Sequence, residues 1–111
     1  MPGEIVHLTH RDELRKYADT HRVVILKATA TWCGPCKRCA PLVNKLFSTM
    51  PDNVSMVIVD IDDGRDIKSF LKITSVPILY NIINGQLMDS VVGSAEDHIR
   101  SFFKKTLRRA S

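Results

Sequence analysis

The pattern of hydrophobic and polar positions alternates between two kinds of segment along the chain. Apolar runs rich in valine and isoleucine, at 23–26 and 54–61, lack the polar alternation of a half-exposed strand and predict strands buried on both faces. Between the apolar runs, hydrophobic residues recur every three to five positions, which is typical of amphipathic helices. We expect strands at 4–8, 23–26, 54–61, 78–83 and 87–92, with helices at 9–20, from 35, around 67–71 and from 94.

The last two predicted strands are joined by Asn84-Gly85. This dipeptide readily adopts the positive φ angles of a tight turn, so the two strands form a hairpin. The element order is then βαβαβαββα. Because parallel strands need helical crossovers, the chain is predicted to have an α/β fold with a central mixed sheet flanked by helices.

Two predicted helices have a recognisable start, and one has a clear buried face. Thr9 with Asp12, and Ser94 with Asp97, have the spacing of a capping box. The last helix carries an apolar stripe that we expect to cover the sheet, made of Ile99, Phe102, Phe103 and Leu107.

Length and composition describe an ordinary globular chain. The 111 residues predict one domain, residues 1–111, and 44% hydrophobic with 25% charged residues excludes a disordered or fibrous protein. The first residues show no secretory signal, and the longest apolar runs are far below the ~20 residues of a membrane helix. We therefore expect a cytoplasmic protein that does not bind membranes. We also expect no nucleic-acid binding, because the basic residues that contribute part of the net charge of +4 are suited to the C-terminus of a helix.

Three cysteines in the pattern Cys33-x-x-Cys36-x-x-Cys39 are the chemical centre of the sequence. Their odd number and close spacing point to thiol chemistry or metal binding rather than to structural disulfides. Cys33 lies at a strand-to-helix junction, where free backbone N–H groups favour a thiolate, so its pKa is expected to fall below the ~8.5 of a free cysteine. Cys33 is then the nucleophile of a disulfide exchange, and Cys36 resolves the mixed disulfide.

The segment Trp32-Cys33-Gly34-Pro35-Cys36-Lys37, followed by Ala40-Pro41, resembles the thioredoxin family. The similarity covers nearly the whole chain and implies the thioredoxin fold and a protein-disulfide reductase. It places Val76-Pro77 where the family has a cis-proline facing the dithiol, and Gly93 where it has a later glycine.

The resemblance also implies a target-binding surface and an electron donor. The expected substrate-binding residues are Trp32, Gly34, Pro35, Val76, Pro77 and Gly93, with Ile78 adding apolar contact. The substrates are disulfides in proteins, and no bound cofactor or metal is needed. The donor is expected to be a flavin-dependent thioredoxin reductase that uses NADPH, with a glutathione-linked donor as the alternative.

The chain departs from the family pattern near the dithiol. Lys27 stands where thioredoxins usually carry a buried acidic residue, and Ile58 replaces the lysine that usually accompanies it. The side chain of Lys27 either turns inward, where burial lowers its pKa, or reaches solvent. Ala28-Thr29-Ala30 also replaces the aromatic pair that commonly precedes the motif. Lys27 is therefore a candidate for tuning the redox chemistry.

The sequence leaves two questions open: the role of Cys39, and whether the chain is catalytic. Cys39 is either a buried small hydrophobe, a second resolving thiol, or a ligand with Cys33 and Cys36 for an iron–sulfur cluster. The chain could instead be a non-catalytic binding module that uses the same groove. The scattered histidines and the aspartates of 60–66 show no metal-binding spacing.

Overall fold

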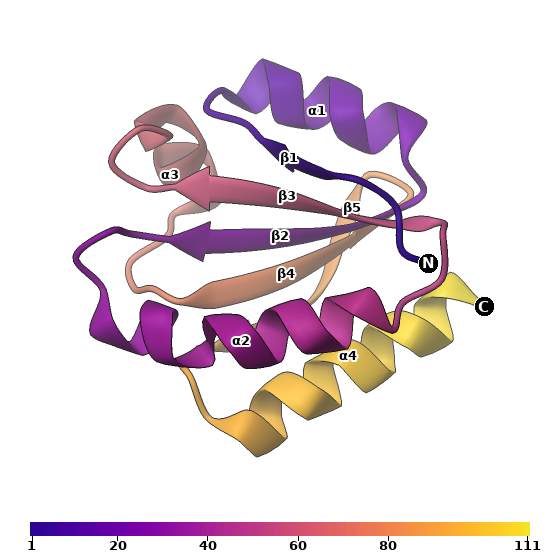
Figure 1. The fold of residues 1–111 in the computed structure, drawn as a ribbon. Coiled ribbons are helices and arrows are strands. Elements are labelled where there is room, and N and C mark those ends of the chain that lie inside the picture. Colours follow the sequence, from indigo (N-terminus) through magenta and orange to yellow (C-terminus); the bar gives the residue numbers. More distant parts are fainter.

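The strands form one five-stranded mixed sheet in the order β1-β3-β2-β4-β5 (Figure 1). A computed structural model describes residues 1–111. The strands are β1 (Ile5–His7), β2 (Val23–Thr29), β3 (Val54–Asp60), β4 (Ile78–Ile83) and β5 (Gln86–Val92). β3 is parallel to β1 and β2, whereas β4 is antiparallel to β2 and β5. The predicted mixed sheet is confirmed.

Four helices cover the two faces of the sheet, as Figure 1 shows. They are α1 (Arg11–Thr20), α2 (Gly34–Ser48), α3 (Arg65–Leu71) and α4 (Glu96–Ala110). α1 and α3 pack with Val24 and Leu26 of β2, and α2 and α4 pack with Val23 and Ile25. Alternate residues of β2 point to opposite faces of the sheet, so its apolar run contributes side chains to the core on both faces. Val23 through Leu26 are fully buried, as predicted.

The topology brings several chain segments to one end of the sheet. β2 and β3 are parallel, so their carboxyl ends lie at the same edge. α2 begins five residues after β2 ends, at Gly34. β4 runs antiparallel to β2, and its first residue pairs with Ala28 near the end of β2. The cysteine motif and the Val76-Pro77 segment therefore meet at this edge, on the left of Figure 1.

The hairpin between β4 and β5 is confirmed. Asn84 and Gly85 have φ angles of 51° and 81°. β4 and β5 pair from Ile78 with Val92 to Ile83 with Gln86, with one irregularity between Asn81 and Ile82. The turn residues therefore set the register of the edge strand.

The two predicted helix caps are wrong in detail. α1 is capped at His10, where the Glu13 carboxylate accepts hydrogen bonds from the backbone N–H groups of Thr9 and His10 at 3.2 Å and 3.0 Å. α4 has Ala95 at its N-cap and no capping side chain, so Ser94 does not serve. Both sequence patterns place the capping residue one position too early.

The apolar stripe of α4 is confirmed at three of its four positions. Ile99, Phe102 and Phe103 are buried against the sheet, whereas Leu107 is 43% exposed. Leu107 follows Phe103 by four residues but lies at the edge of the buried face, where it is partly open to solvent.

No helix in the structure combines the length and apolar character needed to cross a bilayer.

Candidate functional site

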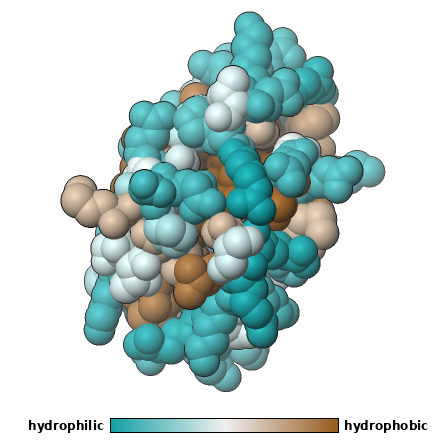
Figure 2. Space-filling view, turned by 90° about the vertical axis from the view of Figure 1, so that its right-hand side faces the viewer, coloured by the Kyte–Doolittle hydropathy of each residue, from teal (hydrophilic) through white to brown (hydrophobic).

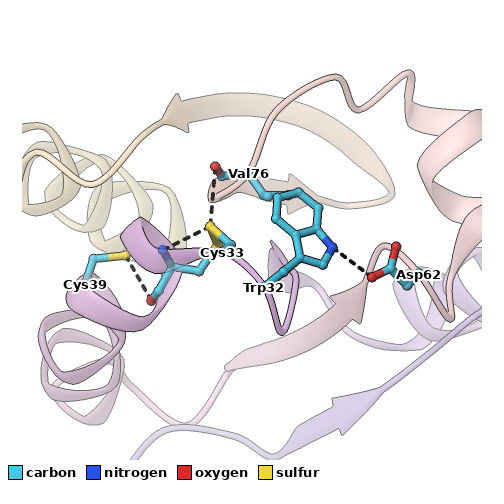
Figure 3. Close-up of a disulfide and its surroundings, with 6 residues drawn as sticks. Trp32, Cys33, Cys39, Asp62 and Val76 are labelled. Carbon is cyan, nitrogen blue, oxygen red and sulfur yellow. Dashed lines mark hydrogen bonds between the residues drawn. A yellow bond between two sulfur atoms is a disulfide. The ribbon is translucent and has the colours of Figure 1, made fainter.

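Cys33 and Cys36, the two cysteines of the CxxC segment, form a disulfide at the start of α2 (Figure 3). Cys33 is the N-cap of α2 and Cys36 lies in its first turn, with a Cα–Cα distance of 5.3 Å. The backbone N–H of Cys36 donates to Cys33 Sγ at 3.1 Å. Gly34 and Pro35 occupy the first helical positions, where proline loses no helical hydrogen bond. The predicted pairing of Cys33 with Cys36 is confirmed.

A second segment lies against the sulfur of Cys33. The Val76-Pro77 peptide bond is cis, as the family resemblance implied. The Val76 carbonyl oxygen lies 3.7 Å from Cys33 Sγ (Figure 3). Gly93, at the end of β5, donates its backbone N–H to the Pro77 carbonyl at 2.9 Å. The structure thus brings Val76, Pro77 and Gly93 together beside the dithiol, while Ile78 is buried in the core.

Trp32 presents the largest exposed apolar surface beside the dithiol. Its side chain is 66% exposed, and its indole N–H donates to Asp62 Oδ2 at 2.9 Å (Figure 3). Asp62 was not among the predicted site residues. The available signal was its position just after β3, since the carboxyl ends of adjacent parallel strands meet at one edge.

A cavity of about 250 Å³ lies behind the dithiol, between β2 and α2. Lys27, Cys36, Cys39, Asp60 and Pro77 are among its lining residues. Lys27 is half-buried and turns to the α2 face of the sheet, so the inward orientation is the one adopted. Burial lowers the pKa of the Lys27 ammonium, against a smaller opposing effect of Cys39. Asp60 is a second residue that the sequence reasoning missed.

Lys27 has no acidic partner across the sheet. It lies opposite Ile58 of β3 and opposite Leu79 of β4. None of the ion pairs of the structure involves Lys27. The positive charge of Lys27 therefore acts on the groups that share its cavity.

Cys39 is a free, buried thiol one turn of helix after Cys36. It donates to the Cys36 carbonyl oxygen at 3.6 Å (Figure 3). Burial raises the pKa of the Cys39 thiol, and the nearby charge of Lys27 partly opposes this effect. With Cys33 and Cys36 joined and Cys39 directed to a carbonyl, the three sulfurs do not form the ligand set of a metal cluster. The iron–sulfur alternative is not favoured.

The family comparison matches nearly the whole chain. The thioredoxin family model matches residues 4–105. An H-type thioredoxin of Ricinus communis is 32% identical over 100 residues, covering 90% of this chain and 84% of that protein. Thioredoxin-3 of Dictyostelium discoideum is 36% identical over 99 residues, covering 89% and 93%.

Solved structures agree with the sequence comparisons. The oxidised form of mitochondrial thioredoxin 3 from Saccharomyces cerevisiae superposes with a TM-score of 0.83 at 31% identity, covering 91% of this chain and 94% of that one. The thioredoxin of Malassezia sympodialis gives a TM-score of 0.82 at 29% identity, covering 96% and 94%. Each superposition therefore includes more than nine tenths of this chain.

Proposed function

The chain belongs to the thioredoxin family, and from this premise we propose how its cysteines share the reduction of a target disulfide. The protein is a thiol–disulfide oxidoreductase that acts as a protein-disulfide reductase. One observation carries the assignment of roles: Cys33 is the N-cap of α2 and lies beside the Val76 carbonyl, whereas Cys36 lies inside the helix.

In the first step, the Cys33 thiolate attacks one sulfur of the target disulfide. A bond forms between Cys33 Sγ and that sulfur, the target S–S bond breaks, and the other target sulfur leaves as a thiolate that takes up a proton. The Cys36 N–H, 3.1 Å from Cys33 Sγ, and the amino end of α2 stabilise negative charge on this sulfur. Cys36 has no equivalent set of free donors, because it lies within the helix.

In the second step, Cys36 loses its proton and attacks Cys33 Sγ. The Cys33–Cys36 bond forms, and the second target sulfur leaves as a thiolate and is protonated. The target gains two electrons and two protons, and the protein is left oxidised. The Cα–Cα distance of 5.3 Å lies within the normal range for a disulfide, so ring closure needs no movement of the helix.

The target binds along the segment that carries Val76. The backbone of Val76 is available to pair with an extended target peptide, in the manner of strand addition. Trp32, Gly34, Pro35, Pro77 and Gly93 complete the rim of this groove around the sulfurs. Cys33 and Cys36 are only 4% and 6% exposed, so the small residues at 34 and 93 matter because they let another polypeptide approach the sulfurs closely.

Lys27 tunes the exchange through its charge. The cavity behind Cys36 contains Lys27, so a protonated amine stabilises the Cys36 thiolate that forms in the second step. The buried acidic residue usual in the family would instead accept a proton from Cys36. Lys27 and that acidic residue therefore both favour the Cys36 thiolate, Lys27 through its charge and the acid by proton transfer. Cys39 also lines this cavity and is the candidate second resolving thiol.

A cycle of reductions needs an electron donor. A flavin-dependent thioredoxin reductase that uses NADPH regenerates the dithiol, and a glutathione-linked donor is the alternative if Lys27 raises the reduction potential. The bonds made and broken in the exchange are between sulfur atoms, so the reaction needs no bound cofactor. A reducing compartment such as the cytoplasm suits a protein that must return to the dithiol form.

Insulin reduction by dithiothreitol tests the proposed roles. The wild-type protein should accelerate precipitation of the reduced insulin chains, and Cys33→Ser should abolish the acceleration. Cys36→Ser should lose turnover but accumulate a mixed disulfide with the target, detectable as a mass adduct on Cys33. Cys39→Ser tests the candidate second resolving thiol, and Ser101→Ala, on the exposed face of α4, is the control that should keep full activity. An adduct on Cys36 in Cys33→Ser, at the same rate, would reverse the assignment.

A further inference from the structure

α3 and the residue that ends it present three basic side chains without ion-pair partners. Arg65, Lys68 and Lys72 are exposed: Arg65 and Lys68 lie one turn apart on α3, and Lys72 is its C-cap. All ion pairs of the structure involve other residues. These three side chains line a surface hollow of about 520 Å³ together with Asp62 and Thr74, and we call it the basic hollow.

The acidic residues nearby leave the basic hollow positively charged. Asp62 is the only carboxylate that lines it, and one oxygen of Asp62 accepts the Trp32 N–H. Asp66, on the same helix, is held by Arg11 of α1 through an ion pair of 2.9 Å. Asp63 is exposed beside the hollow but forms no ion pair. Three cations therefore face one carboxylate.

The basic hollow lies beside the proposed target groove. Thr74 lies two residues before Val76, a span of at most about 7 Å. Asp62, at the other side of the hollow, is bonded to Trp32, the neighbour of Cys33. A target strand that pairs with Val76 and continues past Thr74 therefore comes within reach of Lys68 and Lys72.

We propose that the basic hollow binds acidic side chains of the target polypeptide that flank the attacked cysteine along the strand paired with Val76. The inference rests on the proposed function and narrows it to a class of substrate: disulfides flanked by aspartate or glutamate. Exposed pairs are individually weak, so the selectivity comes from three cations acting on neighbouring charges.

A pair of disulfide peptides that differ only in a four-residue flank, Glu or Gln, tests the proposal. The second-order rate of reduction by the prereduced protein can be followed by the fluorescence of Trp32, the only tryptophan. The wild type should reduce the Glu peptide about tenfold faster than the Gln peptide at low salt, which corresponds to about 1.4 kcal/mol. At about 0.5 M salt the ratio should approach one, because screening shortens the range of the interaction.

Arg65→Gln/Lys68→Gln/Lys72→Asn should reduce this rate ratio to below twofold. Asparagine is chosen at 72 because Lys72 has a φ of 55°, which asparagine tolerates. The matched control neutralises three exposed cations on α4, at Lys104, Lys105 and Arg108, and should keep the full ratio.

These cations belong to the C-terminal half of α4, which runs to the end of the molecule where both chain termini lie, opposite the start of α2 (Figure 1). Figure 2 shows that mainly hydrophilic side chains cover this end. If both triple variants lose the rate ratio equally, the proposal is wrong, because the preference for the Glu peptide would then come from the net charge of the protein rather than from the basic hollow.

A binding measurement separates this proposal from the proposed function. Cysteine-free Glu and Gln peptides are titrated into the oxidised protein, again with Trp32 fluorescence, and the Glu peptide should bind about tenfold more tightly. Reduction of the small neutral bis(2-hydroxyethyl) disulfide by the wild type tests the dithiol alone. If that reduction fails while the Glu peptide still binds selectively, the proposed function is wrong and the basic hollow stands. Equal binding of both peptides rejects the basic hollow whatever the activity.

Discussion

At the scale of single residues, one buried amide joins the edge hairpin to the last helix. Asn81 of β4 is fully buried, and its Nδ2 donates to Asp89 Oδ2 at 2.9 Å and to Thr106 Oγ1 at 3.0 Å. Its Oδ1 accepts the backbone N–H of Asp89 at 2.8 Å. Every polar group of the amide is satisfied, which is the condition for burying it at low cost.

Asn81→Ala should lower the free energy of unfolding by about 1–3 kcal/mol, because it leaves the Asp89 N–H without its acceptor and removes one donor each from Asp89 Oδ2 and Thr106 Oγ1. Urea denaturation at neutral pH measures the loss. Ser101→Ala, on the exposed face of α4, is the control and should change the value by less than about 0.5 kcal/mol. Equal effects of the two substitutions would show that the amide network contributes nothing.

Lys27 should destabilise the folded protein while it is charged. Its folded-state pKa is lowered by burial, so the folded state binds the proton less tightly than the unfolded chain. Stability must then rise with pH between the folded-state pKa and the unfolded value of about 10.4. Lys27→Met removes the charge and should stabilise the protein by on the order of 1 kcal/mol at neutral pH, a typical size for a point substitution.

The gain from Lys27→Met should shrink as the pH rises and vanish above about 10.4, where wild-type Lys27 is neutral in both states. Urea midpoints between about pH 7 and pH 11 follow it. Lys104→Met, at an exposed lysine on α4, should show no such trend. If the gain in stability stays constant with pH, the difference in stability between wild type and Lys27→Met comes from packing rather than from charge.

The predicted site residues differ from the missed ones in how their contacts arise. Cys33 and Cys36 are three residues apart at a helix start, so local geometry alone brings their sulfurs together. Asp62 reaches Trp32 across 30 positions, and Asp60 enters the cavity only because β3 pairs with β2 in one register. Such contacts depend on strand pairing, which side-chain patterns along a single segment do not encode.

At the scale of elements, boundaries that rest on backbone chemistry were predictable and helix caps were not. The Asn84-Gly85 turn requires positive φ, and these residue types supply it. A cap depends on the conformation of one residue, and His10 and Ala95 take that place without the preferred side chain. Glu13 satisfies the N–H groups at the start of α1 instead.

Gly85→Ala should destabilise the protein through backbone conformation alone. A Cβ at Gly85 meets nothing within 4 Å, so no steric clash contributes. The φ of 81° costs an L-residue about 1–2 kcal/mol. Thermal or urea unfolding should show a loss of this size, and Gly85→Asn should recover most of it because asparagine tolerates the left-handed region. Equal losses for Ala and Asn would point to the side chain rather than to φ.

At the scale of the whole molecule, two arginine–aspartate pairs join elements that are distant in sequence. Arg11 of α1 bonds Asp66 of α3, and Arg109 of α4 bonds Asp89 of β5 at 2.6 Å. Hydrogen bonding from each arginine holds the pKa of its aspartate below the ordinary value. One pair fastens the helices on one face of the sheet, and the other fastens the last helix to the edge strand.

These lowered pKa values set the response of the fold to acid. An aspartate whose pKa is depressed in the folded state stabilises it above the unfolded value of about 3.9, and this contribution is lost as the pH falls through the folded-state pKa. Wild-type urea midpoints should therefore decrease below about pH 4 more steeply than those of Arg11→Gln/Arg109→Gln, and the two curves should converge near pH 2. Arg38→Gln/Arg108→Gln removes two exposed arginines without ion-pair partners and should retain the steep decrease. Parallel curves for the wild type and Arg11→Gln/Arg109→Gln down to about pH 2 would show that other carboxylates control the acid transition.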